Sequence, residues 1–121
     1  MNGKFFLDTN AIIDSINKKF KFPKHLYFIS IITEMELLSF SKLTYNDEIL
    51  LRQLLENFQI VNISDEIKEK SIFIRKNYGI KLPDSIICAS SIVEKAILIS
   101  DDKQLKKIDN LKIVSLDEYI Q

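Results

Sequence analysis

Short apolar runs alternate with helix-like stretches along the whole chain, and this alternation limits the folds open to it. The runs fall at residues 5–7, 26–29, 60–63, 96–99 and 112–116. Each is short and rich in the residue types that favour strands. Strands that alternate with helices predict a mostly parallel sheet covered on both faces. We therefore expect the α/β class, as a three-layer α/β/α sandwich.

Helix signals fill the gaps between the expected strands. In the first gap, Thr9 and Asn10 suit the turn and N-cap of a helix that carries residues 11–16. Pro83 suits the first turn of another helix, which runs through an apolar stretch to Val93. Similar signals predict further helices at residues 64–79, 104–108 and 117–120.

The second gap is long enough for two helices. Ser30 or Thr33 can cap the first, which we expect to run to Leu43. The second should run from Asn46 to Phe58, with four apolar side chains on its buried side: Ile49, Leu50, Leu54 and Leu55. We expect the pair to form a helical hairpin.

Length and composition favour one intracellular domain. A chain of 121 residues can bury a single core, so we expect one domain over residues 1–121. Its single cysteine, Cys88, cannot form an internal disulfide, which suits a reducing compartment. We see neither a signal peptide nor an apolar run long enough to span a membrane. We therefore expect a cytoplasmic protein with no membrane partner.

Basic residues gather in one segment, although the formal net charge of the chain is zero. Between residues 17 and 25, lysines alternate with aromatic rings: Lys18, Lys19, Lys21 and Lys24 with Phe20, Phe22 and His25. Such a segment can contact phosphates and stack on bases of a nucleic acid. It is also typical of a solvated surface loop tethered by its aromatics, which is the commoner meaning of a run of charges. Sequence alone leaves both interpretations open.

Acidic residues stand at the edges of apolar elements, where a charge is costly to place. Asp8 follows the first strand, and Asp101 and Asp102 follow the strand that ends at Ser100. Asp84 opens an apolar helix, and Glu36 lies in a helix beside Leu37. Each has a purely structural explanation as a cap, a first-turn acid or a solvated residue.

Geometry favours a shared site for these acids. In an alternating α/β fold, strand ends and the starts of the following helices lie at one edge of the sheet. Carboxylates gathered there repel one another unless a divalent cation binds or their pKa values rise. A set of oxygen ligands suits Mg2+ or Mn2+. Such an ion activates water and neutralises charge on a phosphodiester, so the pattern indicates metal-assisted phosphoryl hydrolysis.

Four stretches carry a resemblance to a known family. FLDTNAIID, TEMELL, LPDSIICAS and ILISDDKQL occur in the order and spacing of the PIN-domain ribonucleases. At this length the chain is most similar to the VapC-type toxins of toxin–antitoxin pairs. The resemblance implies an endoribonuclease that depends on Mg2+ or Mn2+ and acts on an RNA substrate. It also implies a homodimer and a cognate antitoxin that blocks the acidic site.

The resemblance assigns roles to individual residues. It implies that four acids are catalytic, namely Asp8, Glu36, Asp84 and Asp102, and that Asp8, Asp84 and Asp102 bind the metal. Asp101 would replace or assist Asp102 as a ligand. Thr9, Asn10 and Ser100 match polar positions that support the site. One departure is Leu105, which stands where the family usually has an aromatic residue and affects packing more than chemistry.

Other functions fit the sequence less well. Haloacid-dehalogenase-like phosphatases repeat the acid two residues after the first, and here that position is Asn10. A receiver domain would need paired acids after the first strand and a lysine after the last, and neither occurs. A non-catalytic PIN-like module that binds RNA or a partner protein is the main alternative. Catalysis by His25 or Cys88 finds no partner residues in the sequence.

Overall fold

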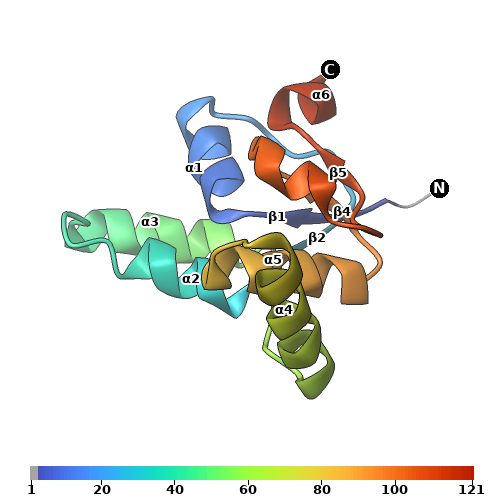
Figure 1. Cartoon of the computed structure of the whole chain (residues 1–121). Helices are drawn as coiled ribbons and strands as arrows, with labels where there is room; N and C mark the ends of the chain where they lie inside the picture. The colour runs from blue at the N-terminus through green and yellow to red at the C-terminus, as the bar shows by residue number, and fades with distance from the viewer. Residues whose placement is uncertain (1–2) are drawn as a thin grey trace.

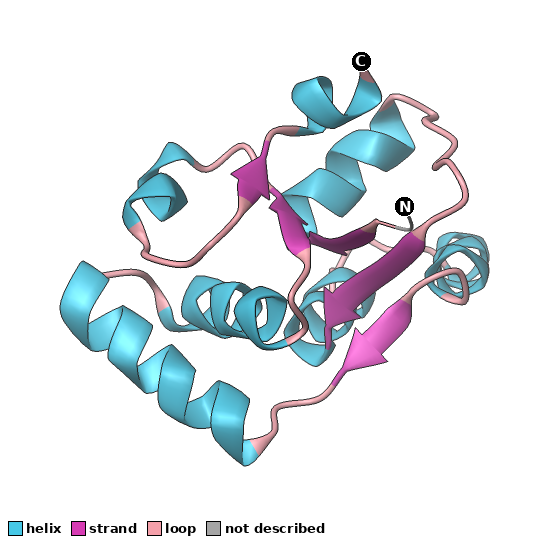
Figure 2. Ribbon diagram, turned by 90° about the vertical axis from the view of Figure 1, so that its right-hand side faces the viewer, coloured by secondary structure: helices cyan, strands magenta, loops and turns pink. Residues whose placement is uncertain are grey.

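A computed structural model describes residues 3–121. Its centre is a five-stranded sheet with the strand order β3-β2-β1-β4-β5, in which all neighbouring strands run parallel. The strands are β1 (Lys4–Leu7), β2 (Leu26–Ser30), β3 (Gln59–Val61), β4 (Ile97–Ile99) and β5 (Ile113–Val114). The predicted α/β class is confirmed, and the sheet is parallel throughout. Figure 2 shows its twist.

Helices connect every pair of consecutive strands. Helix α1 (Thr9–Asn17) follows β1, and α2 (Ile31–Leu38) and α3 (Tyr45–Leu55) follow β2. Helices α4 (Asp65–Tyr78) and α5 (Leu82–Val93) join β3 to β4. The chain ends with a short 3-10 helix, η1 (Lys103–Lys107), the strand β5 and helix α6 (Leu116–Ile120). No helix in residues 3–121 is both long and apolar enough to cross a membrane.

Successive strand residues point to opposite faces of the sheet and build two cores. Phe6 and Phe28 lie in the core that α4 and α5 cover, whereas Leu7 and Ile29 lie in the core with α1 and Leu116 of α6. All four of these strand side chains are buried. Figure 1 shows α1 and α6 on one side of the strands and α4 and α5 on the other, which is the expected three-layer arrangement.

The two helices of the second gap are shorter than the sequence predicts. Ser30, one of the two predicted caps, caps α2 by accepting a hydrogen bond from the backbone N–H of Ile32, and Thr33 lies within the helix. Helix α2 ends at Leu38 and not at Leu43. The next helix begins after Thr44, whose hydroxyl and Asp47 form a reciprocal capping box.

Two side chains predicted to be buried on α3 are exposed. Ile49 keeps 40% of its surface accessible and Leu50 keeps 65%, whereas Leu55 on the same helix is 4% exposed. Leu55 is the buried residue of α3, and Leu51 and Leu54 pack partly buried against the same core, so the core face of this helix is narrower than its apolar stripe. The third strand is also shorter than predicted, because Ile63 lies beyond β3 and is 42% exposed.

Candidate active site

Asp8 occupies the junction between β1 and α1. Its backbone N–H donates to Ile99 of β4, and its Oδ1 accepts a 2.8 Å hydrogen bond from the backbone N–H of Ala11. Asp8 itself is therefore the N-cap of α1. Thr9 and Asn10, predicted to form the turn and the cap, lie instead in the first turn of the helix.

Burial of the Asp8 carboxylate has an electrostatic cost. Only 7% of the residue is exposed, and this desolvation raises the pKa of Asp8 above its ordinary value. Hydrogen-bonding interaction with the Ser100 hydroxyl and the Ala11 amide opposes the rise, while the negative charges of Asp84 and Asp101 add to it. The site thus holds a carboxylate that would gain from a nearby cation.

A chain of hydroxyl groups ties Glu36 to Thr9, the residue that follows Asp8. The Oγ1 atom of Thr9 donates to Oε1 of Glu36 at 2.7 Å, and it lies 3.0 Å from Oγ1 of Thr33. A threonine hydroxyl has one proton, so Thr33 must be the donor to Thr9. Helices α1 and α2 are thereby joined by side chains at the carboxyl ends of β1 and β2.

Asp84 approaches the same edge from the opposite face of the sheet. It lies in the first turn of α5, directly after Pro83. Partial burial raises its pKa, and the charges of Asp102 and Glu36 raise it further, in that order, whereas Lys81 lowers it. Asp84 is therefore close enough to both carboxylates to interact with each of them electrostatically.

The two acids after β4 have different surroundings. Oδ1 of Asp102 accepts from the backbone N–H of Gln104 and caps η1, and its own backbone N–H donates to the Ser100 hydroxyl. Oδ1 of Asp101 instead accepts from the backbone N–H of Leu116, at the start of α6. The charge of Asp102 acts on Asp84, whereas that of Asp101 acts on Asp8.

The strand ends therefore bring the predicted acids to one edge of the sheet, but the carboxylates are not arranged closely around one point. In residues 3–121, no three Asp, Glu, His or Cys side chains are already arranged to hold a metal ion. Four like charges without a cation repel one another, so an open arrangement is the physically favoured one. Asn10 is exposed beside Thr9. Among residues 3–121, its side chain forms no hydrogen bond with the acids.

Cys88 and His25 lie outside this acidic chemistry. Burial on α5 raises the pKa of the Cys88 thiol to about 12, with smaller contributions from Asp84, Asp8 and Asp102. A thiol in that state is a poor nucleophile at neutral pH. His25 is exposed at the opposite end of the strands, before β2, where its Nδ1 accepts from the backbone N–H of Gly3.

The predicted basic residues follow α1, in the segment that leads to β2. Lys18 is partly tied down by an ion pair with Asp117 at 2.8 Å. Lys19, Lys21 and Lys24 are exposed, and none of them forms an ion pair with another residue in the range 3–121. Of the four, Lys18 reaches toward the acids: it pairs with Asp117, beside the residue that Asp101 caps, and the charge of Asp101 contributes to the raised pKa of Lys18.

One site neighbour was not among the predicted residues. Thr33 is fully buried, and its hydroxyl donates to that of Thr9. It is therefore the first residue of the hydrogen-bond chain that ends at Glu36. Thr33 lies three residues before Glu36, so both side chains are on one face of α2. A polar residue at this spacing in a mostly apolar helix is the sequence feature that could have predicted its role.

Sequence comparison identifies the family. The model of the PIN domain matches residues 5–111. A search of curated proteins gave no match. Because the matched region is most of the chain, the family assignment does not depend on one motif.

Structure comparison gives the same family. A chain of a toxin–antitoxin complex from Klebsiella pneumoniae is 32% identical, with a TM-score of 0.77 and 92% of this chain and 96% of that chain covered. VapBC2 from Rickettsia felis, bound to a DNA fragment from their promoter, is 24% identical with a TM-score of 0.79, covering 93% and 98%. VapBC-1 from nontypeable Haemophilus influenzae is 22% identical with a TM-score of 0.79, covering 94% and 98%. This chain therefore belongs to the PIN domain family of nucleases and has the fold of the VapC-type toxins.

Proposed function

We propose that this protein is an endoribonuclease that uses Mg2+ or Mn2+ and serves as the toxin of a toxin–antitoxin pair. The observation that supports this most strongly is the meeting of Asp8, Glu36, Asp84 and Asp102 at one edge of the sheet, with the pKa values of Asp8 and Asp84 raised. Burying carboxylates beside one another is unfavourable unless a cation compensates them. We also propose that the protein works in the cytoplasm.

The donor chemistry of the site fits a hard divalent cation. Asp8, Asp84 and Asp102 would hold the ion through carboxylate oxygens, with Asp101 as an alternative ligand. Mg2+ commonly binds one or two carboxylates and keeps water and substrate phosphate as its other ligands, so an open set of acids is suitable. When bound, such an ion lowers the pKa of water and offsets negative charge on a phosphodiester.

Residues of the chain would orient the reactants. Glu36 is fixed by Thr9, and its second oxygen is available to accept a proton from the attacking water. Ser100 supports both acids of the central strands, since it interacts with the Asp8 carboxylate and accepts from the Asp102 amide. Asn10, exposed at the rim, would contact the RNA or the bound water.

The test is cleavage of a structured RNA by purified protein with Mn2+, with EDTA, and with Asp8→Asn. Asparagine is also a good N-cap, so this variant keeps helix α1 capped while it removes the charge. We expect cleavage by the wild type with Mn2+ alone, and a rate at least about 100-fold lower for Asp8→Asn, since metal-ion stabilisation of the transition state is several kcal/mol.

A matched pair on helix α2 serves as the control. Glu36→Gln should slow cleavage strongly, whereas Glu34→Gln, which alters an acid two positions away and on another side of the helix, should not. Cleavage by Asp8→Asn at the wild-type rate would rule out the mechanism. No cleavage by the wild type under any condition would favour the alternative of a non-catalytic PIN-like module.

We also propose a cognate antitoxin as a protein partner. An apolar groove of about 540 Å³ starts at Thr9 and Glu36 and continues between α1 and α3. Its lining includes exposed apolar side chains, among them Ile13, Phe40 and Leu50. A segment seated there would cover the acidic edge. A short reading frame for a DNA-binding protein beside this gene would support the toxin–antitoxin pair. A molecular mass of two chains in solution would support the homodimer.

A further inference from the structure

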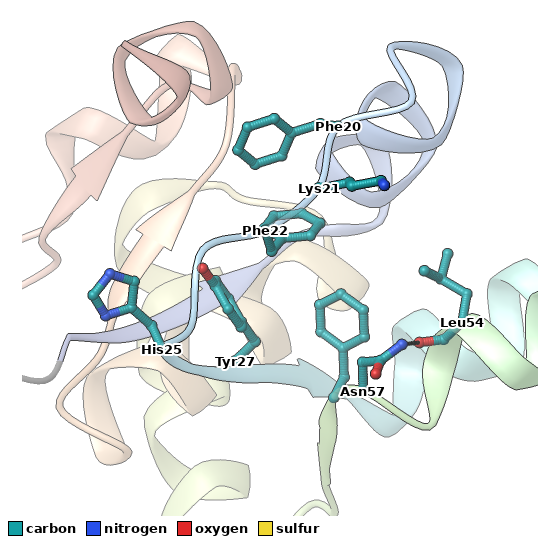
Figure 3. Close-up of a pocket in the computed structure, with 8 residues that line it drawn as sticks. Phe20, Lys21, Phe22, His25, Tyr27, Leu54 and Asn57 are labelled. Atoms are coloured by element: carbon teal, nitrogen blue, oxygen red, sulfur yellow. Dashed lines mark hydrogen bonds between the residues drawn. The ribbon is translucent and has the colours of Figure 1, made fainter.

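A second pocket lies at the end of the sheet opposite the acids. It has a volume of about 410 Å³ and is formed by the segment after α1, the start of β2 and the end of α3. Three phenylalanines line it, namely Phe20, Phe22 and Phe58, together with Lys21, His25, Tyr27, Leu54 and Asn57. Figure 3 shows Phe22 at its centre, with Lys21 extending on the side where Leu54 and Asn57 lie.

The aromatic rings of this pocket are fixed by packing on one another. The ring of Phe22 contacts those of Tyr27, Phe58 and Phe20 edge to face, with centroids 5.0, 5.8 and 4.9 Å apart. Tyr27 and Phe58 are buried, whereas Phe20 and Phe22 are only half-buried. The pocket therefore presents ring surface that is held in place and still accessible to a flat ligand.

The lysines beside the pocket favour a ligand that carries negative charge. Lys21 lines the pocket, Lys24 lies three residues further along the same segment, and both are exposed. Within residues 3–121 no acid pairs with either of them, whereas Lys18 is already paired with Asp117. Aromatic rings beside uncompensated lysines are the combination that binds single-stranded nucleic acid, through base stacking and phosphate contacts.

The pocket is also connected to the acidic edge. Leu54 lines both this pocket and the apolar groove, which reaches Thr9 and Glu36 at its other end. Helix α1 runs along the groove, and its nine residues rise about 14 Å. An RNA strand could therefore reach from the pocket to the acids over a few nucleotides.

We propose that this aromatic pocket binds a nucleotide of single-stranded RNA, with its base against Phe22 and flanking phosphates on Lys21 and Lys24. The inference rests on the proposed function, because it concerns the same RNA substrate at a point remote from the cleavage site. It assigns a role in substrate binding to the basic segment, and none in the chemical step.

The test measures binding of a fluorescent 12-nucleotide single-stranded RNA of mixed sequence to the full chain in EDTA. Phe22→Leu should weaken binding by roughly 5- to 100-fold, the range found when one stacking ring is lost. The logarithm of the binding constant falls linearly with the logarithm of the salt concentration, with a slope of about 0.7 per phosphate contact on a single strand. The double variant Lys21→Gln/Lys24→Gln should therefore reduce this slope by about 1.4.

Matched controls lie on α4, on the other face of the sheet. Phe73 is 58% exposed there, and Lys70 and Lys76 lie on the same helix. Phe73→Leu and Lys70→Gln/Lys76→Gln should bind the RNA as the wild type does. Because Phe22→Leu also loses packing, its thermal melting is recorded, and the lysine variant decides the question if Phe22→Leu does not fold.

A crosslinking arm needs no variant at all. RNA that contains 5-iodouridine, irradiated on the wild-type protein, should crosslink within residues 20–27. Unchanged affinity and slope in the variants, with crosslinks elsewhere, would overturn the inference. The inference would also be overturned if the pocket variants bound RNA as tightly as the wild type but no longer bound a co-expressed protein partner. The pocket would then be a protein-docking surface.

The outcomes separate this inference from the proposed function. If the wild type cleaves RNA with Mn2+ but the pocket variants bind RNA normally, the inference alone fails. If the wild type cleaves nothing and crosslinks still form within residues 20–27, the proposed nuclease activity fails and the pocket stands as an RNA-binding site.

Discussion

The two ends of the parallel sheet are made by the same strands and differ in what stabilises them. At the carboxyl end, Asp8 and Asp84 are partly or fully buried next to other acids, and their pKa values are raised. At the amino end, Phe22, Tyr27 and Phe58 pack edge to face, and the exposed Lys21 lines the pocket that they form. One end keeps unfavourable charge within the fold, whereas the other is built from favourable packing.

The difference separates what each end can do. Buried acids without a compensating cation reduce the free energy of unfolding, so they are retained for a task other than stability. The aromatic end stabilises the fold through the packing of its rings, and the RNA binding proposed there would use ring surface that this packing leaves accessible. We therefore expect variants at the carboxyl end to change catalysis and metal binding, and variants at the amino end to change stability and RNA affinity.

The largest effect that sharpens this comparison concerns metal-linked stability. Saturating Mn2+, at about 100 times its Kd, should raise the free energy of unfolding of the wild type by about 2.7 kcal/mol. Asp84→Asn should show a much smaller gain. Lys21→Gln/Lys24→Gln should gain as much as the wild type, measured by urea denaturation with and without Mn2+. Equal gains for wild type and Asp84→Asn would contradict the placement of the ion at the acids.

A smaller effect is expected at the aromatic end. The Tyr27 hydroxyl donates to the carbonyl of Pro23 at 2.6 Å and also pairs with the hydroxyl of Tyr119. Tyr27→Phe should lower the free energy of unfolding by about 1 kcal/mol, the usual net contribution of a hydrogen bond. Tyr45→Phe, at a side chain that is 80% exposed, is the control and should leave stability unchanged. A change in the Mn2+ gain of Tyr27→Phe would break the proposed separation of the two ends.

The smallest effect is a pH dependence of the carboxyl end in EDTA. The pKa of Asp8 is raised in the folded state, so protonation favours folding, and this contribution is lost as the pH rises through the folded pKa. The stability of the wild type relative to Asp8→Asn should therefore increase when the pH falls from 7 to 5. Urea denaturation of both proteins at the two pH values measures this difference. A wild type that instead loses stability relative to Asp8→Asn would contradict the assigned direction.

Sequence patterns predicted the sheet well, because strand signals and polar caps are local. The runs around Phe6, Phe28 and Leu98 all became buried strands. Ser64 caps α4 through its hydroxyl, and Gly79 ends that helix in the left-handed conformation, at φ 68°. Such signals act within a few residues, so one sequence contains all the information that they need.

Other predictions failed where a distant contact decides the outcome. The apolar stripe of α3 predicted burial of Ile49 and Leu50, but periodicity cannot distinguish a core face from a groove lining. The hydroxyl chain from Thr33 through Thr9 to Glu36 joins two helices and needs the fold to be seen. The roles of the individual acids remain predictions of the family resemblance, which cleavage and metal binding will test.

Asp8 caps α1 and is also a proposed metal ligand, so the cap constrains the carboxylate that an ion would meet. Its Oδ1 is committed to the Ala11 amide at the positive end of a helix dipole, which draws electron density away from that oxygen. Because the Ser100 hydroxyl also interacts with the carboxylate, an ion in the proposed site would share Asp8 with two hydrogen-bond donors that belong to the fold. A glutamate at position 8 would extend the carboxylate past the amide and uncouple helix capping from ion binding.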